Sequence, residues 1–161
     1  GSEMCIRDSA MGRATVKSFD VKSRFVHFEF FRLLKDHEGL GRKGELIGLE
    51  VNMRPSGGIS PDMMNFSQST DVYKIWADMI AYDSSLRGIG QTAFCAFAGR
   101  RDGKNFVMSD EDIMHKYGAN MKMSGRVADA LSGAMGNQMY IANFNTKEEM
   151  DAFYNDVLAC R

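Results

Sequence analysis

Apolar and polar side chains alternate along two stretches in the first half of the chain. Residues 24–33 (RFVHFEFFRL) and residues 47–54 (IGLEVNMR) both show the two-residue period of a β-strand. In the second stretch one face is apolar, formed by Ile47, Leu49, Val51 and Met53, and the other is polar, formed by Glu50, Asn52 and Arg54. In the first stretch, His27 and Glu29 share a face with Phe25 and Phe31. The pattern predicts two strands that each carry polar side chains on one face.

The segment between these strands predicts how they pair. Residues 35–44 contain three glycines and several charged residues, which suits an exposed connection longer than a tight hairpin turn. Antiparallel pairing would bring Glu29 beside Glu50 and Asn52. The second strand should end near Pro55, because proline cannot donate to a sheet ladder and the glycines that follow tolerate positive φ in a turn that can touch a ligand.

Weaker patterns predict the other elements of the first half. We expect a short helix over residues 14–19, a connection of low periodicity over residues 60–70, a helix over residues 71–80 and a subdomain boundary over residues 84–90. The apolar residues of the second helix recur at three- and four-residue spacing, so this helix should have one buried face. Trp76 lies on that face and is predicted to be a core residue.

The second half alternates between strand and helix patterns. Residues 92–99 predict a strand, and Asp102-Gly103 predicts a tight turn after which residues 104–108 return as the second strand of a hairpin. Ser109 followed by Asp112, and Thr146 followed by Glu149, are capping patterns for two helices. Strands are predicted over residues 121–127 and 138–144, while residues 128–136 are ambiguous. The Arg100-Arg101 pair is predicted to be solvated.

The polar residues of the first two strands favour one kind of chemistry. Glu29, Glu50 and Asn52 offer two carboxylates and an amide oxygen, a hard donor set that suits Mg²⁺ or Mn²⁺ better than Zn²⁺. Arg54 adds a permanently charged fork that can bind a phosphate or a carboxylate. These residue types indicate phosphoryl chemistry. The alternative is a surface ion pair between Glu50 and Arg54 on the wet face of a sheet, with Asn52 exposed between them.

A resemblance strengthens the first interpretation. The stretch Glu50-Val51-Asn52-Met53-Arg54, preceded by Phe28-Glu29-Phe30, resembles the metal-binding end of the ATP-grasp superfamily, where the pattern is Glu-x-Asn-x-Arg. The helix expected over residues 71–80 resembles the one that follows this motif, so the resemblance covers residues 14–82, about half of the chain.

The resemblance implies roles for five residues. It implies that Glu29, Glu50 and Asn52 hold Mg²⁺ (or Mn²⁺) against the phosphates of ATP, and that Arg54 steadies an acyl- or carboxy-phosphate intermediate. His27 stands two residues before Glu29, where many relatives carry a basic residue that faces the phosphates. Packing of His27 among aromatic side chains is the alternative.

The resemblance also implies a function and partners. It implies the C-terminal part of an ATP-dependent, ADP-forming ligase that joins a small carboxylate to an amine through an acyl-phosphate. In this superfamily the lobe with most phosphate-binding lysines precedes the motif, and residues 10–24 hold no counterpart of it. We therefore expect an N-terminal lobe of the same polypeptide to complete the site, and this fragment to be inactive alone. A non-catalytic nucleotide- or metal-binding interaction module is the alternative.

Composition adds limits to these predictions. The chain has 161 residues, of which 44% are apolar, enough for a hydrophobic core. With a net charge of −1 and scattered basic residues, no nucleic-acid or membrane partner is predicted. The sequence contains no bilayer-length apolar run and no signal-peptide pattern. Its three cysteines lack metal-ligand spacing, which favours a cytoplasmic protein.

The patterns together predict an α+β fold in which helices flank an antiparallel sheet. Residues 10–83 are expected to form the C-terminal lobe of an ATP-grasp fold, and residues 91–161 a small α/β C-terminal subdomain. Residues 1–9 fit neither part. They resemble a remnant of an expression tag followed by adapter sequence, and are left out of the fold prediction.

Overall fold

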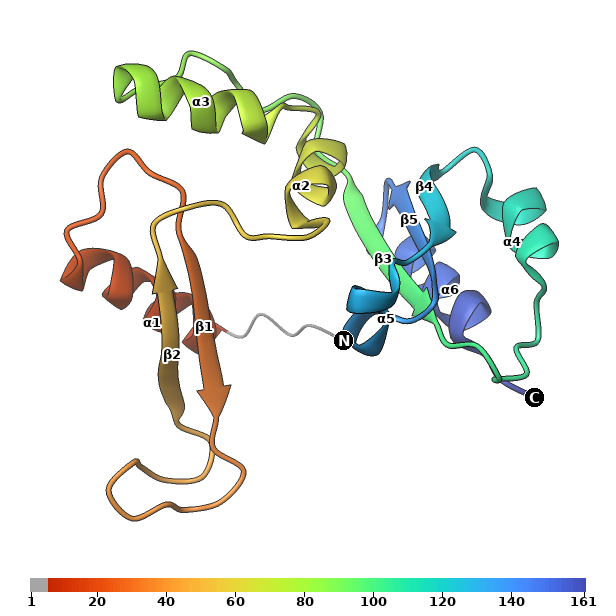
Figure 1. The fold of residues 1–161 in the computed structure, drawn as a ribbon, viewed down its shortest axis with the longest axis horizontal. Helices are drawn as coiled ribbons and strands as arrows, with labels where there is room; N and C mark the ends of the chain where they lie inside the picture. The colour runs from red at the N-terminus through yellow and green to blue at the C-terminus, as the bar shows by residue number, and fades with distance from the viewer. Residues whose placement is uncertain (1–5) are drawn as a thin grey trace. The chain divides into compact units, whose positions relative to one another are not determined.

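The computed structural model in Figure 1 describes residues 6–161, and their side chains from Ala10 onward. Within these residues it has six helices and two small antiparallel sheets, so the α+β class is confirmed. The described chain divides into two compact units. Unit 1 comprises residues 6–58 and 73–86, and unit 2 comprises residues 59–72 and 87–161. The expected first lobe, residues 10–83, therefore contributes residues 59–72 to unit 2.

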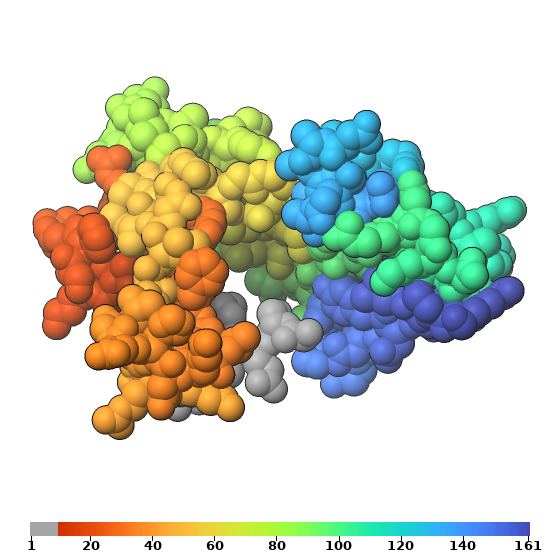
Figure 2. Space-filling view, turned by 60° about the horizontal axis from the view of Figure 1, so that its bottom comes forward, coloured from red at the N-terminus to blue at the C-terminus, as the bar shows by residue number. Residues whose placement is uncertain are grey.

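Unit 1 is built on a long hairpin. Its strands are β1 (His27–Arg32) and β2 (Leu46–Asn52), which pair antiparallel as predicted. Helix α1 (Ile6–Ser18) precedes the hairpin and begins earlier than the helix expected over residues 14–19. Figure 2 shows the connection between the strands, in orange, on the surface of the molecule. Its exposure follows from its glycines and charged side chains, which have little apolar area to bury.

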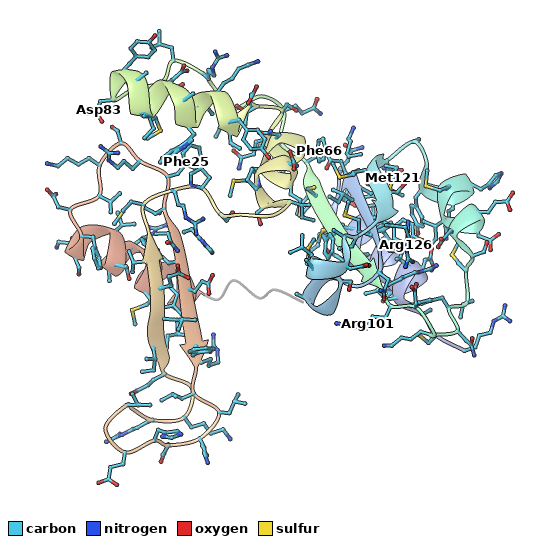
Figure 3. All side chains as sticks on the ribbon, in the orientation of Figure 1. Phe25, Phe66, Asp83, Arg101, Met121 and Arg126 are labelled. Atoms are coloured by element: carbon cyan, nitrogen blue, oxygen red, sulfur yellow. The ribbon has the colours of Figure 1, made fainter. Side chains whose placement is uncertain are left out.

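Helix α3 (Val72–Tyr82) belongs to unit 1 from Tyr73 onward, and its presence confirms the helix predicted over residues 71–80. Phe25, labelled in Figure 3, lies beneath this helix and meets Trp76 edge to face, with 6.1 Å between ring centroids. Trp76 is only half-buried. No side chain of residues 10–58 or 73–86 is fully buried, so the prediction that Trp76 is a core residue was wrong.

Unit 2 contains the three-stranded sheet and the main core. Its strands β3 (Phe94–Arg100), β4 (Met121–Arg126) and β5 (Gln138–Phe144) lie in the order β3-β5-β4, with both pairs antiparallel. The three strands match the stretches predicted for them. The predicted hairpin was wrong: residues 102–103 do turn, but β3 pairs with β5, and Phe106 pairs instead with Cys160 in an isolated bridge.

One face of the sheet carries the hydrophobic core. Ala96 pairs with Ala142 and Ala98 with Tyr140, so alternate residues of β3 and β5 share this face. Helices α4 (Asp110–Tyr117) and α6 (Lys147–Leu158) complete it with aromatic and aliphatic side chains. The buried members are Ala96, Ala98, Ile113, Tyr117, Tyr140, Ala142, Phe144, Phe153 and Val157. Small alanines opposite bulky rings allow close packing at this face.

The two predicted helix caps are confirmed. Ser109 caps α4 and Thr146 caps α6, each in a capping box in which the side chain accepts the amide of the third helical residue, Asp112 or Glu149, and that residue accepts the cap's own amide. Each box satisfies two amides that the helix itself leaves unpaired. The capping residues therefore determine where both helices begin.

Two other segments of unit 2 form helices that the sequence pattern did not predict. Helix α2 (Ser60–Gln68) occupies the stretch expected to lack regular structure, and α5 (Asp129–Met135) occupies the ambiguous one. Pro61 lies in the first turn of α2, where its missing amide leaves no helical bond unmade. Asn143 on β5 donates its side-chain Nδ2 to the Phe66 carbonyl at 2.6 Å. Tertiary contact therefore supports a helix that has only a weak apolar pattern.

Candidate functional site

The hairpin of unit 1 brings four of the five predicted site residues to neighbouring positions. In its register, His27 lies opposite Asn52 and Glu29 lies opposite Glu50. Opposed residues of antiparallel strands point to the same face, with Cβ atoms about 4.5–5.5 Å apart. His27, Glu29, Glu50 and Asn52 therefore form one polar cluster, which we call the hairpin cluster.

A register shift bounds the hairpin cluster. Glu29 pairs with Glu50, but the next residue, Phe30, pairs with Gly48, so Leu49 is an extra residue in β2. Beyond this bulge Ile47 lies opposite Phe31 and therefore shares the face of Glu29, whereas Val51 lies on the other face. The prediction that Ile47 and Val51 share one apolar face was wrong, because an inserted residue reverses the alternation.

Within the hairpin cluster, His27 and Glu29 are in direct contact. His27 Nε2 lies 3.4 Å from Glu29 Oε1, and the two side chains are 27% and 43% exposed. His27 Nδ1 and Asn52 Nδ2 are buried and have no hydrogen-bond partner within residues 6–161. A buried polar atom without a partner destabilises the folded state by roughly 1–3 kcal/mol. The cluster therefore contains two polar atoms whose hydrogen-bonding capacity is unused.

Arg54 lies just outside the strand. Strand β2 ends at Asn52, and the exposed Arg54 donates its Nη1 to the carbonyl of Pro55 at 3.0 Å. Among the described residues no ion pair joins Arg54 to Glu50, and Asn52 is partly buried rather than exposed. The alternative of a surface ion pair that leaves Asn52 exposed is therefore wrong for this structure.

The donor chemistry of the hairpin cluster fits a hard cation such as Mg²⁺. Glu29 and Glu50 supply adjacent carboxylates, and Asn52 carries an amide oxygen of the kind that hard cations bind. Within residues 6–161 no three His, Cys, Asp or Glu side chains converge closely enough to hold a metal by themselves. Mg²⁺ commonly binds proteins through one or two carboxylates, with water and phosphate oxygens as its other ligands. Two glutamates and an asparagine are compatible with that mode of binding.

A cavity of about 330 Å³ lies next to the motif within unit 1. Its lining includes Met53, which directly follows Asn52, and the basic residues Lys22 and Arg24. The acidic side chains of Asp20 and Asp83 also line it. The cavity therefore offers charges of both signs beside the end of β2.

Unit 2 contains a buried arginine, although the sequence pattern predicted this side chain to be solvated. Arg100 is 4% exposed, while Arg101, labelled in Figure 3, is exposed and donates to the carbonyls of Ser132 and Gly133. The prediction that both arginines are solvated was wrong for Arg100. A signal was present: Arg100 continues the alternation of Ala96 and Ala98, so it falls on the core face of β3.

Partners on three elements surround Arg100. Its Nε donates to the Val157 carbonyl at 2.7 Å, and its Nη1 donates to the Met108 carbonyl at 2.9 Å and to Asp110 at 3.3 Å. Asp110 also accepts the hydroxyl of Tyr140. Burial and this hydrogen bond raise the pKa of Tyr140 well above its ordinary value, so Tyr140 stays a neutral donor.

A second polar group, on the surface of unit 2, joins α4 to α6. Asp156 accepts hydrogen bonds from Lys116 at 2.6 Å and from the hydroxyl of Tyr117. The bonds from Lys116 and Tyr117 lower the pKa of the Asp156 carboxyl below its ordinary value. Burial raises the pKa of the Cys95 thiol to about 11, which makes it a poor nucleophile at neutral pH.

Comparison with known proteins finds no match among protein-family models, curated proteins or solved structures. The helices within residues 6–161 are all too short or too polar to cross a lipid bilayer.

Proposed function

We propose that residues 27–54 form the Mg²⁺- and phosphate-binding hairpin of an ATP-grasp ligase that joins a carboxylate to an amine. The observation that carries this proposal is the register of β1 and β2, which sets Glu29 opposite Glu50 and His27 opposite Asn52. Two like charges placed directly opposite each other are unfavourable for a structural sheet. A cation that bridges them would convert this repulsion into binding energy.

Each side chain has a role in the proposed reaction. Glu29, Glu50 and Asn52 would hold the cation, which would supply positive charge to neutralise the phosphates. His27 and Arg54 donate hydrogen bonds to phosphoryl oxygens, and the planar guanidinium of Arg54 suits two oxygens of one phosphoryl group. A carboxylate oxygen attacks the γ-phosphorus of ATP and ADP leaves. The amine then attacks the acyl carbon, phosphate leaves, and the nitrogen loses a proton. Fixed charges around the phosphoryl group supply most catalysis of this kind.

Exposed apolar side chains on unit 1 are the argument for a second lobe as its partner. Phe31 is 60% exposed and Leu49 is 54% exposed, both on the hairpin that carries the cluster. Large apolar side chains next to a polar site are typical of a surface that another part of a protein covers. We therefore propose that a nucleotide-binding lobe of the same polypeptide closes over the hairpin, with ATP between the two lobes.

Titration with Mn²⁺, followed by electron paramagnetic resonance of the free ion, tests the site directly. One Mn²⁺ should bind per chain, more tightly when ATP is present, because the phosphates add ligands to the same ion. Glu29→Gln and Glu50→Gln should each abolish most of this binding. Glu38→Gln is the matched control, because Glu38 is an exposed carboxylate on the hairpin loop, away from the cluster.

Two further results would separate the possible outcomes. Arg54→Lys should weaken the effect of ATP without changing the binding of Mn²⁺ alone, because lysine keeps the charge but loses the planar fork. Equal binding by wild type and Glu50→Gln would show that the proposed metal site is wrong. Turnover then distinguishes a ligase from a nucleotide-binding module: ADP release by the full-length gene product should require both a carboxylate and an amine.

A further inference from the structure

A cavity of about 640 Å³ in unit 2 lies beside the buried arginine. Its walls come from the end of β3, from the segment that runs from the 102–103 turn into the first turn of α4, and from the residue that follows the Phe106–Cys160 bridge. Pockets that bind small molecules are commonly about 300–1,000 Å³ in volume. The space therefore suits a small organic molecule or an inorganic ion with its water.

The guanidinium of Arg100 has one nitrogen without a partner. Its Nε and Nη1 bind protein oxygens, but Nη2 is buried and has no hydrogen-bond partner within residues 6–161. The ring of Phe106, another lining residue, lies 4.4 Å from the guanidinium carbon and covers one side of it. A buried charged donor left unpaired is costly, because burial removes its water without replacing the hydrogen bond.

The charges around the cavity favour an anion. Lys104 and Arg161 are exposed and line the cavity together with Arg100. The two acidic lining residues already accept hydrogen bonds from protein donors: Asp110 from Arg100 and Tyr140, and Asp112 from Ser109. The cationic side chains therefore have more hydrogen-bonding capacity left for a ligand than the two carboxylates have.

We propose that this cavity binds a small oxyanion, a carboxylate or a phosphate, with Arg100 Nη2 as its buried donor and Lys104 and Arg161 at its mouth. Nη2 can donate to one oxygen of the anion, and the charged side chains of Lys104 and Arg161 can bind its other oxygens. The site is independent of the hairpin cluster, because all of its residues belong to unit 2. It can therefore exist whether or not unit 1 binds ATP.

The test uses the whole chain with inorganic phosphate and acetate as separate probes, and chloride at equal ionic strength as the reference. Thermal unfolding is followed by circular dichroism, and the side-chain NH resonances of Arg100 are followed by NMR. A bound anion should raise the unfolding temperature with saturation, as expected for a ligand of the folded state. The Arg100 resonances should shift along the same saturation curve.

The variants are placed at exposed positions, so that a change in anion binding does not come from a folding defect. Replacing Arg100 would also remove its bonds to Val157 and Met108, so the variant is Lys104→Gln. It should raise the Kd for the anion about threefold, the effect of losing one exposed charge. Lys122→Gln is the matched control: Lys122 is exposed on β4, outside the cavity lining, and its variant should bind with unchanged Kd.

The result decides between the two chemical sources. Saturation by phosphate alone assigns the site to phosphates, and saturation by acetate alone assigns it to carboxylates. Saturation by both supports a general oxyanion site. The proposal is overturned if neither probe differs from chloride, if the Arg100 resonances do not move, or if Lys122→Gln weakens binding as much as Lys104→Gln does.

Discussion

Replacing Glu50 by glutamine removes one of the two like charges that β1 and β2 place directly opposite each other. Like charges in this position destabilise a sheet by roughly 0.2–1 kcal/mol, and the exposure of Glu50 favours the lower end of that range. In the absence of a divalent ion, Glu50→Gln should therefore make unit 1 slightly more stable. The same change removes a carboxylate ligand, so the stabilisation by Mg²⁺ should largely disappear.

The effect of the metal should be larger than the effect of the charge. Mg²⁺ at about ten times its Kd adds roughly 1.4 kcal/mol to the stability of the folded state. For a unit of this size, that raises the unfolding temperature by roughly 6–11 °C, while relief of the charge repulsion alone adds about 1–2 °C. The wild type should therefore overtake Glu50→Gln as Mg²⁺ is added.

Trp76 provides a local assay for this prediction. It is the only tryptophan of the chain and packs against Phe25 in unit 1, so its fluorescence follows the unfolding of that unit. Melting curves of wild type, Glu50→Gln and Glu38→Gln are compared with and without Mg²⁺ at fixed pH and ionic strength. The reasoning is refuted if wild type shows no shift at about tens of millimolar Mg²⁺, a range far above that of a functional site. A full Mg²⁺ response in Glu50→Gln would refute it as well.

Three further changes test the packing of unit 2, with urea unfolding as the measurement. Gly99→Ala should cost on the order of 1–3 kcal/mol, because its Cβ would lie 1.9 Å from a backbone oxygen, whereas Gly125→Ala, with no atom within 4 Å, should cost little. Thr146→Ala removes the side-chain cap of α6 and should cost about 1 kcal/mol. Asp156→Asn should flatten the acid dependence of stability: the pKa of Asp156 is lowered by Lys116, so its contribution is full above about pH 4 and is lost as the pH falls through the lowered value.

Each of these predictions has a clear contrary result. Equal stability of Gly99→Ala and Gly125→Ala would mean that the close approach of α5 to β3 does not exist in solution. A Thr146→Ala variant as stable as wild type would show that the cap adds nothing to α6. An unchanged acid profile for Asp156→Asn would mean that its bonds to α4 do not survive in solution.

Local sequence patterns were enough to predict most of the regular elements. Local residue patterns, among them the alternation of side chains in β1, β2 and β5, predicted the five strands, and the capping patterns at Ser109 and Thr146 located the starts of α4 and α6. The pairing of β1 with β2 followed from their proximity in the chain. These features depend on interactions within a few residues or across one connection, which a linear pattern records.

The errors lie where distant contacts decide the outcome. Residues 104–108 follow a strong turn signal, but β3 bonds to β5, some forty residues further along, because β5 carries the complementary apolar face. Helix α2 forms in a segment with little periodicity and is joined to β5 through Asn143. In both cases, burial against a distant strand outweighs the local preference.

The two candidate sites show the same contrast between local patterns and distant contacts. The sequence alone determined the residue types of the hairpin cluster and their approximate pairing, because one hairpin holds Glu29 and Glu50 together. Only the tertiary structure decided that a bulge reverses the faces beyond Glu29. It also decided that Arg100 is buried beneath Phe106 beside a cavity whose walls come from three separate parts of the chain. Burial and cavity shape depend on how distant segments pack, and no local pattern of side chains specifies that packing.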